Sequence, residues 1–467
     1  MRWHVRRVGE GASHPGTSAG LPPRGYNRNT SVSPVAAGSG LSGEQRALLA
    51  AEHANMLACI RCGQCLTSCP TYVLSMHEAE GPRGRVAMAR ALLEGQLELT
   101  PELIAHERNC LVCDACSAIC PAGVQMDPLQ VALRAAMDSS VTRPPWQRLM
   151  RGLVFRQVFS NMRVFRSIVR LLWLYQRFGV QRLARGLGIL KLLRMEEMET
   201  LLPRVTEDFL VPRGERYPAS DGSREPLGVS FFAGCIMSTA FAEIDRGTIR
   251  VLQRAGCDVE NTAGQGCCGA LNFHAGDLEG ARRLAQRNIA AFEEDLGGPI
   301  VVNSAGCGAM LKEYAHHFRD DPTWAERARA LSARVKDVTE LLAGRELPMR
   351  RDLGVSVTYQ EPCHLAHAQR IVHQPRALLR SIPGLELREM AESSLCCGSA
   401  GTYNLTNPVE SRQLQDRKLD NALATGASVI VSANPGCLMQ LQGGLARRGS
   451  DVPVKHIVEL LDAATAE

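Results

Sequence analysis

Two runs of closely spaced cysteines constrain this chain more than any other feature of its sequence. In each run three cysteines follow at intervals of three residues, and a fourth stands directly before a proline. The runs are Cys59-x2-Cys62-x2-Cys65-x3-Cys69-Pro70 and Cys110-x2-Cys113-x2-Cys116-x3-Cys120-Pro121. In bacterial ferredoxins with this spacing, three cysteines ligate one [4Fe–4S] cluster and the fourth ligates the other. Two such runs therefore predict two [4Fe–4S] clusters.

The same rule assigns every cysteine of the two runs to a cluster. We expect cluster 1 to be held by Cys59, Cys62, Cys65 and Cys120, and cluster 2 by Cys110, Cys113, Cys116 and Cys69. Helices are predicted at 44–58, before the first run, and at about 85–94, between the runs. The long helical spacer between the runs indicates a helical ferredoxin module rather than a minimal β-type one.

Other uses of seventeen cysteines fit less well. Disulfide scaffolds are typically short and secreted, and residues 1–40 contain no continuous apolar stretch of a secretory signal. No segment has the 18 or so apolar residues of a membrane span. Zinc is satisfied by four thiolates, and two runs of four ending in proline exceed that need. We therefore expect reduced thiols that ligate metal in a cytoplasmic protein.

The C-terminal half contains an internal duplication. GVSFFAGC (228–235) matches GVSVTYQEPC (354–363), IVVNSAGC (300–307) matches VIVSANPGC (429–437), and VKDVTELL (335–342) matches VKHIVELL (454–461). The equivalent cysteines lie 128 to 130 residues apart. Each copy alternates apolar strands with helical stretches such as 281–292 and 411–423, which predicts two α/β domains.

Each copy also supplies a lone cysteine, a Cys-Cys-Gly and a further cysteine after a strand. The candidate ligands of a further cluster are Cys235, Cys267, Cys268 and Cys307 in the first copy, and Cys363, Cys396, Cys397 and Cys437 in the second. Glycines beside these thiols allow tight turns and a close approach of the backbone to a cluster. The sequence leaves open whether one copy binds iron while the other is structural.

Several strings carry a resemblance to a known family. Besides the two cysteine runs, they are GPRGR (81–85), GCCGA (266–270), GCGAMLKEY (306–314) and LCCGSAGTYNLTNP (395–408). The two copies resemble the cysteine-rich CCG domains of the heterodisulfide reductase family. The whole of about 45–465 resembles the iron–sulfur subunit of glycolate oxidase (glycolate dehydrogenase).

The resemblance implies an electron-transfer subunit with no catalytic residue of its own. Its partner would be an FAD subunit that oxidises glycolate to glyoxylate, with or without a second flavin-type subunit, and its electrons would pass toward a quinone or another carrier. No GxGxxG follows a strand, so neither FAD nor NAD is expected on this chain. The alternatives are an iron–sulfur subunit for glycerol 3-phosphate or lactate, a disulfide reductase and a zinc-binding scaffold.

One position in each copy differs from the family pattern, and two histidines lie beside one of the cysteines. In its heterodisulfide reductase form each copy ends in CxxC, whereas here the last position is Met310 in the first copy and Gln440 in the second. His364 and His367 lie beside Cys363, and we expect them to be hydrogen-bonded structural residues rather than ligands.

Residues 143–194 carry twelve basic residues and no Asp or Glu, so the net charge of +5 is concentrated there. Large aliphatic and aromatic residues are interleaved with the basic ones, which argues against nucleic acid. A partner-facing surface or a peripheral contact with the inner face of the cell membrane fits this composition.

The predicted architecture combines an α-helical part with α/β domains. We expect a disordered arm (1–42), a helical two-cluster ferredoxin module (43–142), a basic helical connector (143–225), and two duplicated CCG domains, repeat 1 (226–346) and repeat 2 (347–467).

Overall fold

Short helices separated by loops build the part of the chain that carries the two cysteine runs. The computed structural model describes residues 41–467 apart from 142, 193–198, 201, 221 and 223–224, so the arm predicted at 1–42 lies outside the described residues except for its last two. The helices here are α1 (Gly43–Ala50), α2 (His53–Leu57), α3 (Pro70–Ser75), the 3-10 turn η1 (Glu78–Glu80), α4 (Pro82–Leu93), α5 (Pro101–Arg108), α6 (Ala115–Ile119) and α7 (Met126–Ser140).

Local sequence explains where these helices begin. Ser42 and Gln45 form a capping box at the start of α1. Pro70, Pro82 and Pro101 occupy the first turn of α3, α4 and α5, where the N–H that proline lacks has no helical partner in any case. The helix expected over 44–58 is divided into α1 and α2 by a turn, and the one expected over 85–94 is α4, which begins earlier.

One small core holds the cysteine loops in place. α1 packs against α7 and α4, and Leu49, Ala89 and Leu129 are fully buried between them. Four cysteines lie partly buried against the same core: Cys59, Cys110, Cys116 and Cys120.

The connector is helical, as its sequence predicts. It consists of α8 (Pro145–Gly152), a π-helical turn (Leu153–Val158), α9 (Met162–Arg177), α10 (Val180–Gly186) and α11 (Ile189–Leu192). Asn161 caps α9 by accepting the backbone N–H of Arg163. Met162, Phe165 and Val169 form the buried side of α9 and pack against repeat 1.

Repeat 1 is an α/β domain with a five-stranded sheet of order β1-β3-β2-β4-β5. Only β1 runs antiparallel to its neighbour. The elements are β1 (Glu215–Tyr217), β2 (Leu227–Phe232), α13 (Met237–Ala240), α14 (Ala242–Arg254), β3 (Cys257–Asn261), α15 (Ala270–His274), α16 (Leu278–Glu293), β4 (Ile300–Val302), α17 (Ala305–His317), α18 (Ala325–Arg334), β5 (Val335–Asp337) and α19 (Val338–Leu342).

Repeat 2 has a parallel four-stranded sheet of order β7-β6-β8-β9, which reproduces β3-β2-β4-β5 of repeat 1. Its elements are β6 (Val355–Tyr359), the π-helical turn η3 (His364–Ala368), α20 (His373–Arg380), β7 (Leu385–Leu387), α21 (Tyr403–Thr406), α22 (Pro408–Leu423), β8 (Val429–Ser432), α23 (Pro435–Arg447), β9 (Val454–His456) and α24 (Ile457–Thr465).

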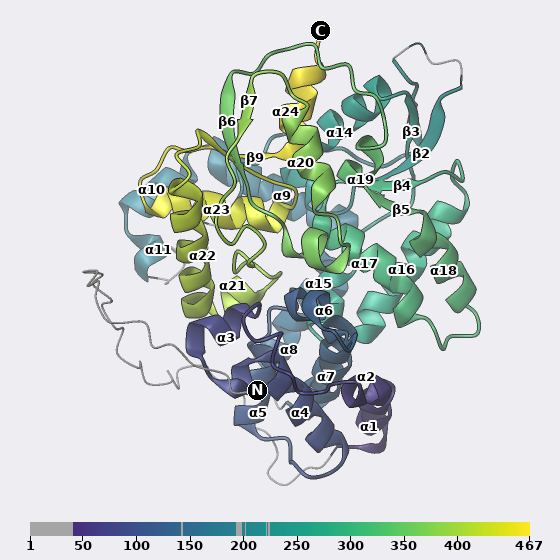
Figure 1. Ribbon diagram of the computed structural model, residues 1–467, viewed down its shortest axis with the longest axis vertical. Helices are drawn as coiled ribbons and strands as arrows, with labels where there is room; N and C mark the ends of the chain where they lie inside the picture. Colours follow the sequence, from purple (N-terminus) through teal and green to yellow (C-terminus); the bar gives the residue numbers. More distant parts are fainter. Residues whose placement is uncertain (1–40, 142, 193–198, 201, 221, 223–224) are drawn as a thin grey trace, which may run out of the picture.

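The two repeats pack as one body above the ferredoxin module (Figure 1). A single hydrophobic core runs from the strands of one repeat to those of the other. α14 of repeat 1 lies against α24 of repeat 2, where Arg254 Nη1 is 2.8 Å from Asp462 Oδ1. The repeats rest on the ferredoxin module through α15 on α7, η3 on α6 and α22 on α3. All three repeat elements follow cysteines, so the cysteine-bearing edges of both sheets face the ferredoxin module.

Candidate metal centres

The two cysteine runs adopt the same loop. Arg61 (φ 58°) and Gly63 (φ 81°) flank the second cysteine of the first run, and Val112 (φ 51°) and Asp114 (φ 57°) flank that of the second. A left-handed conformation costs a non-glycine residue on the order of 1–3 kcal/mol and is rarest for β-branched residues such as valine. Strain of this kind persists where the surroundings enforce it.

The structure brings the predicted cluster 2 ligands together. They line one cavity with an empty volume of about 320 Å³: Cys69, Cys110, Cys113 and Cys116. Cys69 enters from the first run as the residue that precedes α3, whereas Cys110 and Cys113 lie on the loop between α5 and α6, and Cys116 lies in α6. This is the crossed arrangement that the proline-terminated runs predict.

The predicted cluster 1 ligands lie on the adjoining loops. Cys59 follows α2, Cys120 ends α6, and Cys62 is exposed. Burial, together with the nearby Cys59 and Cys120, raises the pKa of Cys65 to about 11, so these three thiols lie within electrostatic reach of one another.

The chemistry of the cluster 2 cavity fits an iron–sulfur cluster. Burial raises the pKa of Cys113 and Cys116 well above its usual range, so at neutral pH both are protonated until a cation displaces the protons. When bound there, a [4Fe–4S] cluster supplies one-electron redox chemistry. The four cysteines would hold it, and the surrounding side chains would set its charge and hydrogen bonding.

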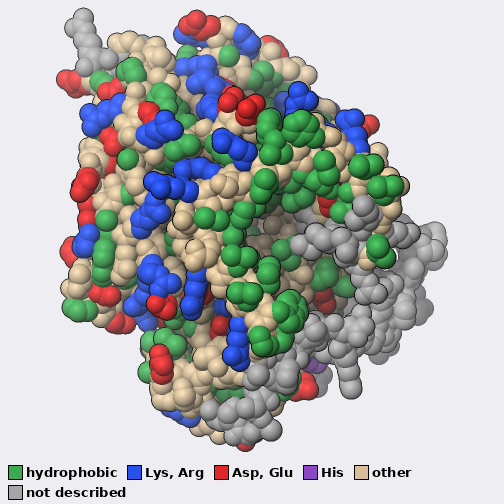
Figure 2. Space-filling view, turned by 180° about the vertical axis from the view of Figure 1, so that it is seen from behind, with side chains coloured by type: hydrophobic (Ala, Val, Ile, Leu, Met, Phe, Trp, Pro, Cys, Tyr) green, Lys and Arg blue, Asp and Glu red, His purple; other side chains and the backbone are tan. Residues whose placement is uncertain are grey.

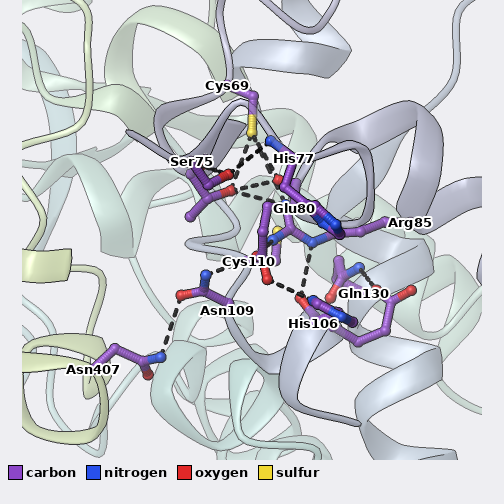
Figure 3. A network of polar contacts seen from close by, with 12 residues as sticks. Cys69, Ser75, His77, Glu80, Arg85, His106, Asn109, Cys110, Gln130 and Asn407 are labelled. Carbon is purple, nitrogen blue, oxygen red and sulfur yellow. Dashed lines mark hydrogen bonds and ion pairs between the residues drawn. The ribbon is translucent and has the colours of Figure 1, made fainter. Parts of the chain in front are cut away.

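A buried ion pair stands beside this cavity. Arg85 Nη2 lies 2.8 Å from Glu80 Oε2, and both side chains are almost fully buried. Arg85 Nη1 reaches to 3.9 Å from Cys69 Sγ. Glu80 is also bonded by His106 Nδ1 at 2.6 Å and Asn109 Nδ2 at 2.7 Å. Figure 3 shows this network, which continues from Asn109 to Asn407 of repeat 2.

The four cysteines of repeat 1 meet at one edge of its sheet. Cys235 follows β2, Cys267 and Cys268 follow β3, and Cys307 lies in the first turn of α17 after β4. Because β2 lies between β3 and β4, the carboxyl ends of these strands border the crevice where open α/β sheets bind ligands. Cys235 Sγ is 3.7 Å from Cys267 Sγ, and Cys267 and Cys307 lie near enough to Cys268 to raise its pKa.

Repeat 2 places its cysteines at the same edge. Cys363 follows β6, the Cys396–Cys397 pair follows β7, and Cys437 lies in α23 after β8. Sγ–Sγ distances are 4.0 Å for Cys363 and Cys396, and 3.5 Å for Cys397 and Cys437. All four thiols are buried.

The residues that replace the last family cysteine are not aimed at metal. Met310 is buried in the hydrophobic core of repeat 1. Gln440 donates to Ser411 Oγ at 3.0 Å and accepts a bond from Asn404. Each repeat is therefore a four-cysteine site.

The repeat sites have different neighbours. Cys363 and Cys396 pack in one cluster with Cys113 of the cluster 2 set. Cys235 and Cys267 instead pack against α9 of the connector. The sites also approach each other, since the backbone N–H of Gly306, beside Cys307, donates to Asn434 Oδ1 at 3.1 Å.

All seventeen cysteines are free thiols. In the described part of the chain, no three His, Cys, Asp or Glu side chains meet at a point that one metal ion would occupy. No described helix is long and apolar enough to cross a membrane.

Family models match three parts of the chain. A 4Fe-4S dicluster domain matches 58–124, a cysteine-rich domain matches 229–312 and 357–442, and the linker region of glycolate oxidase iron-sulfur subunits matches 146–202. The probable glycolate oxidase iron-sulfur subunit of Bacillus subtilis (strain 168) is 38% identical, over 88% of this chain and 94% of its own length. The chain belongs to the glycolate oxidase iron–sulfur subunit family.

Two further relatives show how much of the chain the similarity covers. The glycolate oxidase iron-sulfur subunit of Escherichia coli (strain K12) is 35% identical, over 87% of this chain and 93% of its own length. Lactate utilization protein A of Shouchella clausii (strain KSM-K16) is 34% identical over 99% of its own length, but covers only 51% of this chain. The glycolate oxidase type therefore fits the whole chain better than the lactate alternative does.

Membership of the glycolate oxidase iron–sulfur subunit family confirms several predictions. The fold class is confirmed, with a helical ferredoxin module followed by two cysteine-rich α/β domains. The role as an iron–sulfur electron-transfer subunit of an oxidoreductase is confirmed as well. The assignment of individual cysteines to clusters, and the domain boundaries, stay predictions.

The sequence did not reveal which polar residues surround the thiols. The GPRGR string contains Arg85, but nothing in it indicates that this arginine is buried beside Cys69. His367 makes the structural hydrogen bond expected of it, to Ser394 O at 3.0 Å. His364 is different, because its ring stacks on His274 and its Nδ1 lies 4.0 Å from Cys363 Sγ.

Proposed function

We propose that this chain carries electrons singly from a flavin-containing partner subunit, which oxidises glycolate to glyoxylate, toward a quinone or another carrier. Oxidation of the alcohol releases two electrons to the flavin, and each [4Fe–4S] cluster accepts one at a time. The observation that carries the proposal is the cavity in which Cys69 of the first run joins Cys110, Cys113 and Cys116 of the second. The relatives that span most of the chain are glycolate oxidase iron-sulfur subunits, which supports the choice of substrate.

The arrangement of the thiol sites supports a path through the molecule. The cluster 1 and cluster 2 sets lie on neighbouring loops, since Cys65 is near enough to raise the pKa of Cys116. Cys113 of the cluster 2 set contacts the site of repeat 2, which adjoins that of repeat 1. Electrons would thus enter at the ferredoxin module and leave toward the repeats and the connector.

Metal content and reconstitution with a partner test this function. Anaerobically purified chain is expected to contain at least about eight irons with matching acid-labile sulfide, and little zinc. Cys116→Ser should lower the iron content, whereas Thr67→Ala, at an exposed position in the first run, should not. Zinc without labile sulfide would overturn the proposal.

Glycolate-dependent reduction of the clusters should require the co-expressed flavin subunit. Reduction only by lactate or glycerol 3-phosphate would overturn the substrate assignment.

We also infer that the connector makes a peripheral contact with the anionic inner face of the cell membrane. Six large apolar side chains of α8 to α10 and their links are between 61% and 74% exposed: Trp146, Leu149, Leu171, Phe178, Leu183 and Leu187. Exposed arginines such as Arg163, Arg170 and Arg182 stand among them. Figure 2 shows hydrophobic side chains gathered around a hollow on this face, with basic side chains beside them. Apolar side chains that enter the headgroup region, ringed by arginines, are typical of interfacial helices.

Vesicle binding tests this contact. The chain should sediment with vesicles that contain anionic lipid and much less with neutral ones, and added salt should weaken the binding. Leu171→Glu and Leu183→Glu should abolish it, and Leu405→Glu, at an exposed site in repeat 2, should not. Equal binding by all three variants would overturn the inference.

A further inference from the structure

The two crossed ligands, Cys69 and Cys120, have unequal surroundings. Cys69 Sγ lies 3.3 Å from Thr71 Oγ1 and 3.9 Å from Arg85 Nη1. In the second run the residue equivalent to Thr71 is Ala122, whose side chain has no hydrogen-bond donor. Among the described residues, no side-chain hydrogen bond reaches Cys120 Sγ. A ligating cysteine is a thiolate and only accepts hydrogen bonds, so the guanidinium becomes a donor to Cys69 once it binds iron, whereas the Thr71 hydroxyl donates its one proton to Glu80 O at 2.7 Å.

Arg85 is fixed in place by its remaining contacts. Its Nη1 donates to Thr71 Oγ1 at 3.0 Å and its Nε to His106 O at 3.1 Å, while Nη2 pairs with Glu80 (Figure 3). The side chain is 1% exposed. The guanidinium therefore has one orientation, with one nitrogen toward Cys69 and another toward Glu80.

The electrostatics show that the cation acts on the thiols as well as on its carboxylate. Burial lowers the pKa of Arg85, but Cys110 and Cys69 raise it more than Glu80 does, and it lies above its ordinary value. Glu80 is ionised, because bonds from His106 and Asn109 and the charge of Arg85 outweigh burial and lower its pKa. A positive charge thus faces the cluster 2 ligands, and its negative partner lies behind it.

The neighbouring arginine of the same helix provides a natural contrast. Arg83 pairs with Glu78 in solvent, with Nε 2.7 Å from Oε1, and its Nη1 donates to Arg61 O in the first cysteine loop. Water and salt screen an exposed pair, whereas a buried charge acts through a medium of low dielectric constant. Two arginines, two residues apart, therefore influence the two cluster sites very unequally.

We propose that Arg85 raises the reduction potential of cluster 2 above that of cluster 1, so that an electron entering this chain comes to rest on cluster 2. Reduction adds one negative charge to a cluster, and a buried cation with hydrogen bonds to the sulfurs stabilises that charge. The inference rests on the proposed ligand sets. It also gives the path a direction, because cluster 2 is the site that adjoins repeat 2.

A redox titration of the full chain, followed by electron paramagnetic resonance, tests this proposal. The wild type should show separate reduction steps for cluster 1 and cluster 2, with that of cluster 2 the higher of the two. In Arg85→Gln the higher step should move to a lower potential. At a fixed potential the ratio of reduced to oxidised cluster 2 should be about tenfold smaller, which corresponds to a shift in reduction potential of about 59 mV for one electron. The lower step should stay where it is. Arg83→Gln, which removes an exposed charge beside the first cysteine loop, should leave the higher step where it is.

A second pair of variants separates charge from structure. Glu80→Gln removes the negative partner and should move the same step upward, opposite to Arg85→Gln. Arg85→Lys keeps the charge and should retain most of the wild-type potential. If Arg85→Gln fails to load iron, these two variants decide, because a structural role would not move the step upward in Glu80→Gln while Arg85→Lys keeps it near its wild-type position.

Iron and sulfide content keeps this test apart from that of the proposed function. Fewer than about eight irons in the wild type would refute the ligand sets themselves. With full iron content, three results for Arg85→Gln would overturn the role of Arg85 and leave the clusters intact. They are equal shifts of both steps, no shift of either step, and a shift of the lower step alone.

Discussion

Repeat 1 and repeat 2 share four parallel strands and four cysteines, but not the residues that face those cysteines. Asn288 of α16 donates to Cys267 O at 2.9 Å in repeat 1. The equivalent residue of repeat 2 is Lys418 of α22, which is fully buried and donates to Ser393 O at 3.1 Å. Ile236 follows the first cysteine of repeat 1, whereas His364 follows that of repeat 2. The repeat 1 site is thus neutral in its own residues and the repeat 2 site is basic, although the charge of His364 also reaches Cys307 of repeat 1.

The difference indicates what each site can hold. Burial lowers the pKa of His364, but Cys363 and the carboxylates of Asp114 and Asp127 outweigh burial and raise it to about 9. Burial lowers the pKa of Lys418, and the surrounding thiols oppose that change. Thiolates around a cluster carry negative charge, and buried charge needs a partner of opposite sign. Repeat 2 supplies such partners and lies beside cluster 2, so it is the better place for a further cluster.

The sharpest test of the comparison is the loss of one cysteine from each repeat. Cys397→Ser is expected to lower the iron content from about twelve to about eight per chain, because repeat 2 loses a ligand. Cys268→Ser, at the equivalent site of repeat 1, should leave about twelve. Iron and labile-sulfide analysis of both variants measures this. Equal losses of iron would contradict the difference between the repeats. A loss in Cys268→Ser alone would assign the further cluster to repeat 1 instead.

The second test exchanges the two polar residues. Lys418→Asn should destabilise the chain by about 2–4 kcal/mol, since it leaves the carbonyls of Glu392 and Ser393 unpaired. Asn288→Lys should cost about 3–5 kcal/mol, because it buries a charge without a partner. Urea unfolding measures both.

Lys336→Asn is the matched control for this exchange, because Lys336 pairs with Glu340 at an exposed position and its loss should cost less than about 1 kcal/mol. If Asn288→Lys is tolerated as well as the control, the thiols of repeat 1 already provide a countercharge, and the two sites are more alike than their residues indicate.

The sequence was informative wherever a short spacing determines the chemistry. Cysteine intervals predicted the thiols that share a cavity, and the duplication predicted equivalent strands, because residues that follow parallel strands meet at one edge. Strand β1 was not predicted, since it lies outside the duplicated segment and pairs only with β3 of repeat 1.

Side chains that depend on distant neighbours were beyond such reasoning. Arg83 and Arg85 both lie in the first turn of α4, about 200° apart around the helix axis. Nothing local indicates which of the two is buried, because burial of Arg85 depends on contacts with Thr71 and His106. Asn288 and Lys418 are polar residues in amphipathic helices, and only the packed structure shows that Asn288 bonds to Cys267 O and that the charge of Lys418 lies near the repeat 2 thiols.

The third test uses pH, because the residues that cap equivalent helices of the two repeats have pKa values shifted in opposite directions. Asp337 caps α19 and His456 caps α24. Burial raises the pKa of Asp337 to about 6, and burial lowers that of His456 to about 4, so both groups favour their neutral forms in the folded chain.

The signs of the two effects follow from linkage. His456 contributes stability above its unfolded pKa of 6.5, and this is lost as the pH falls toward 4. Asp337 contributes stability below 3.8, and this is lost as the pH rises through 6. Each effect amounts to about 3 kcal/mol. Urea unfolding between pH 4 and 7 should show that His456→Asn removes an acid-induced loss, whereas Asp337→Asn removes a loss toward neutral pH. Parallel pH curves for both variants and the wild type would contradict this.

The smallest expected difference concerns the glycine after each Cys-Cys pair. Gly269 (φ +83°) and Gly398 (φ +85°) both have a left-handed backbone, which an alanine adopts at a cost of about 1 kcal/mol. A Cβ on Gly269 would lie 3.3 Å from Ala281 O, but one on Gly398 would lie only 2.6 Å from Ser411 O. Gly398→Ala should therefore lower the free energy of unfolding by about 1–2 kcal/mol more than Gly269→Ala. Equal losses would mean that α22 moves aside as easily as α16, and that the basic site is no more tightly packed than the neutral one.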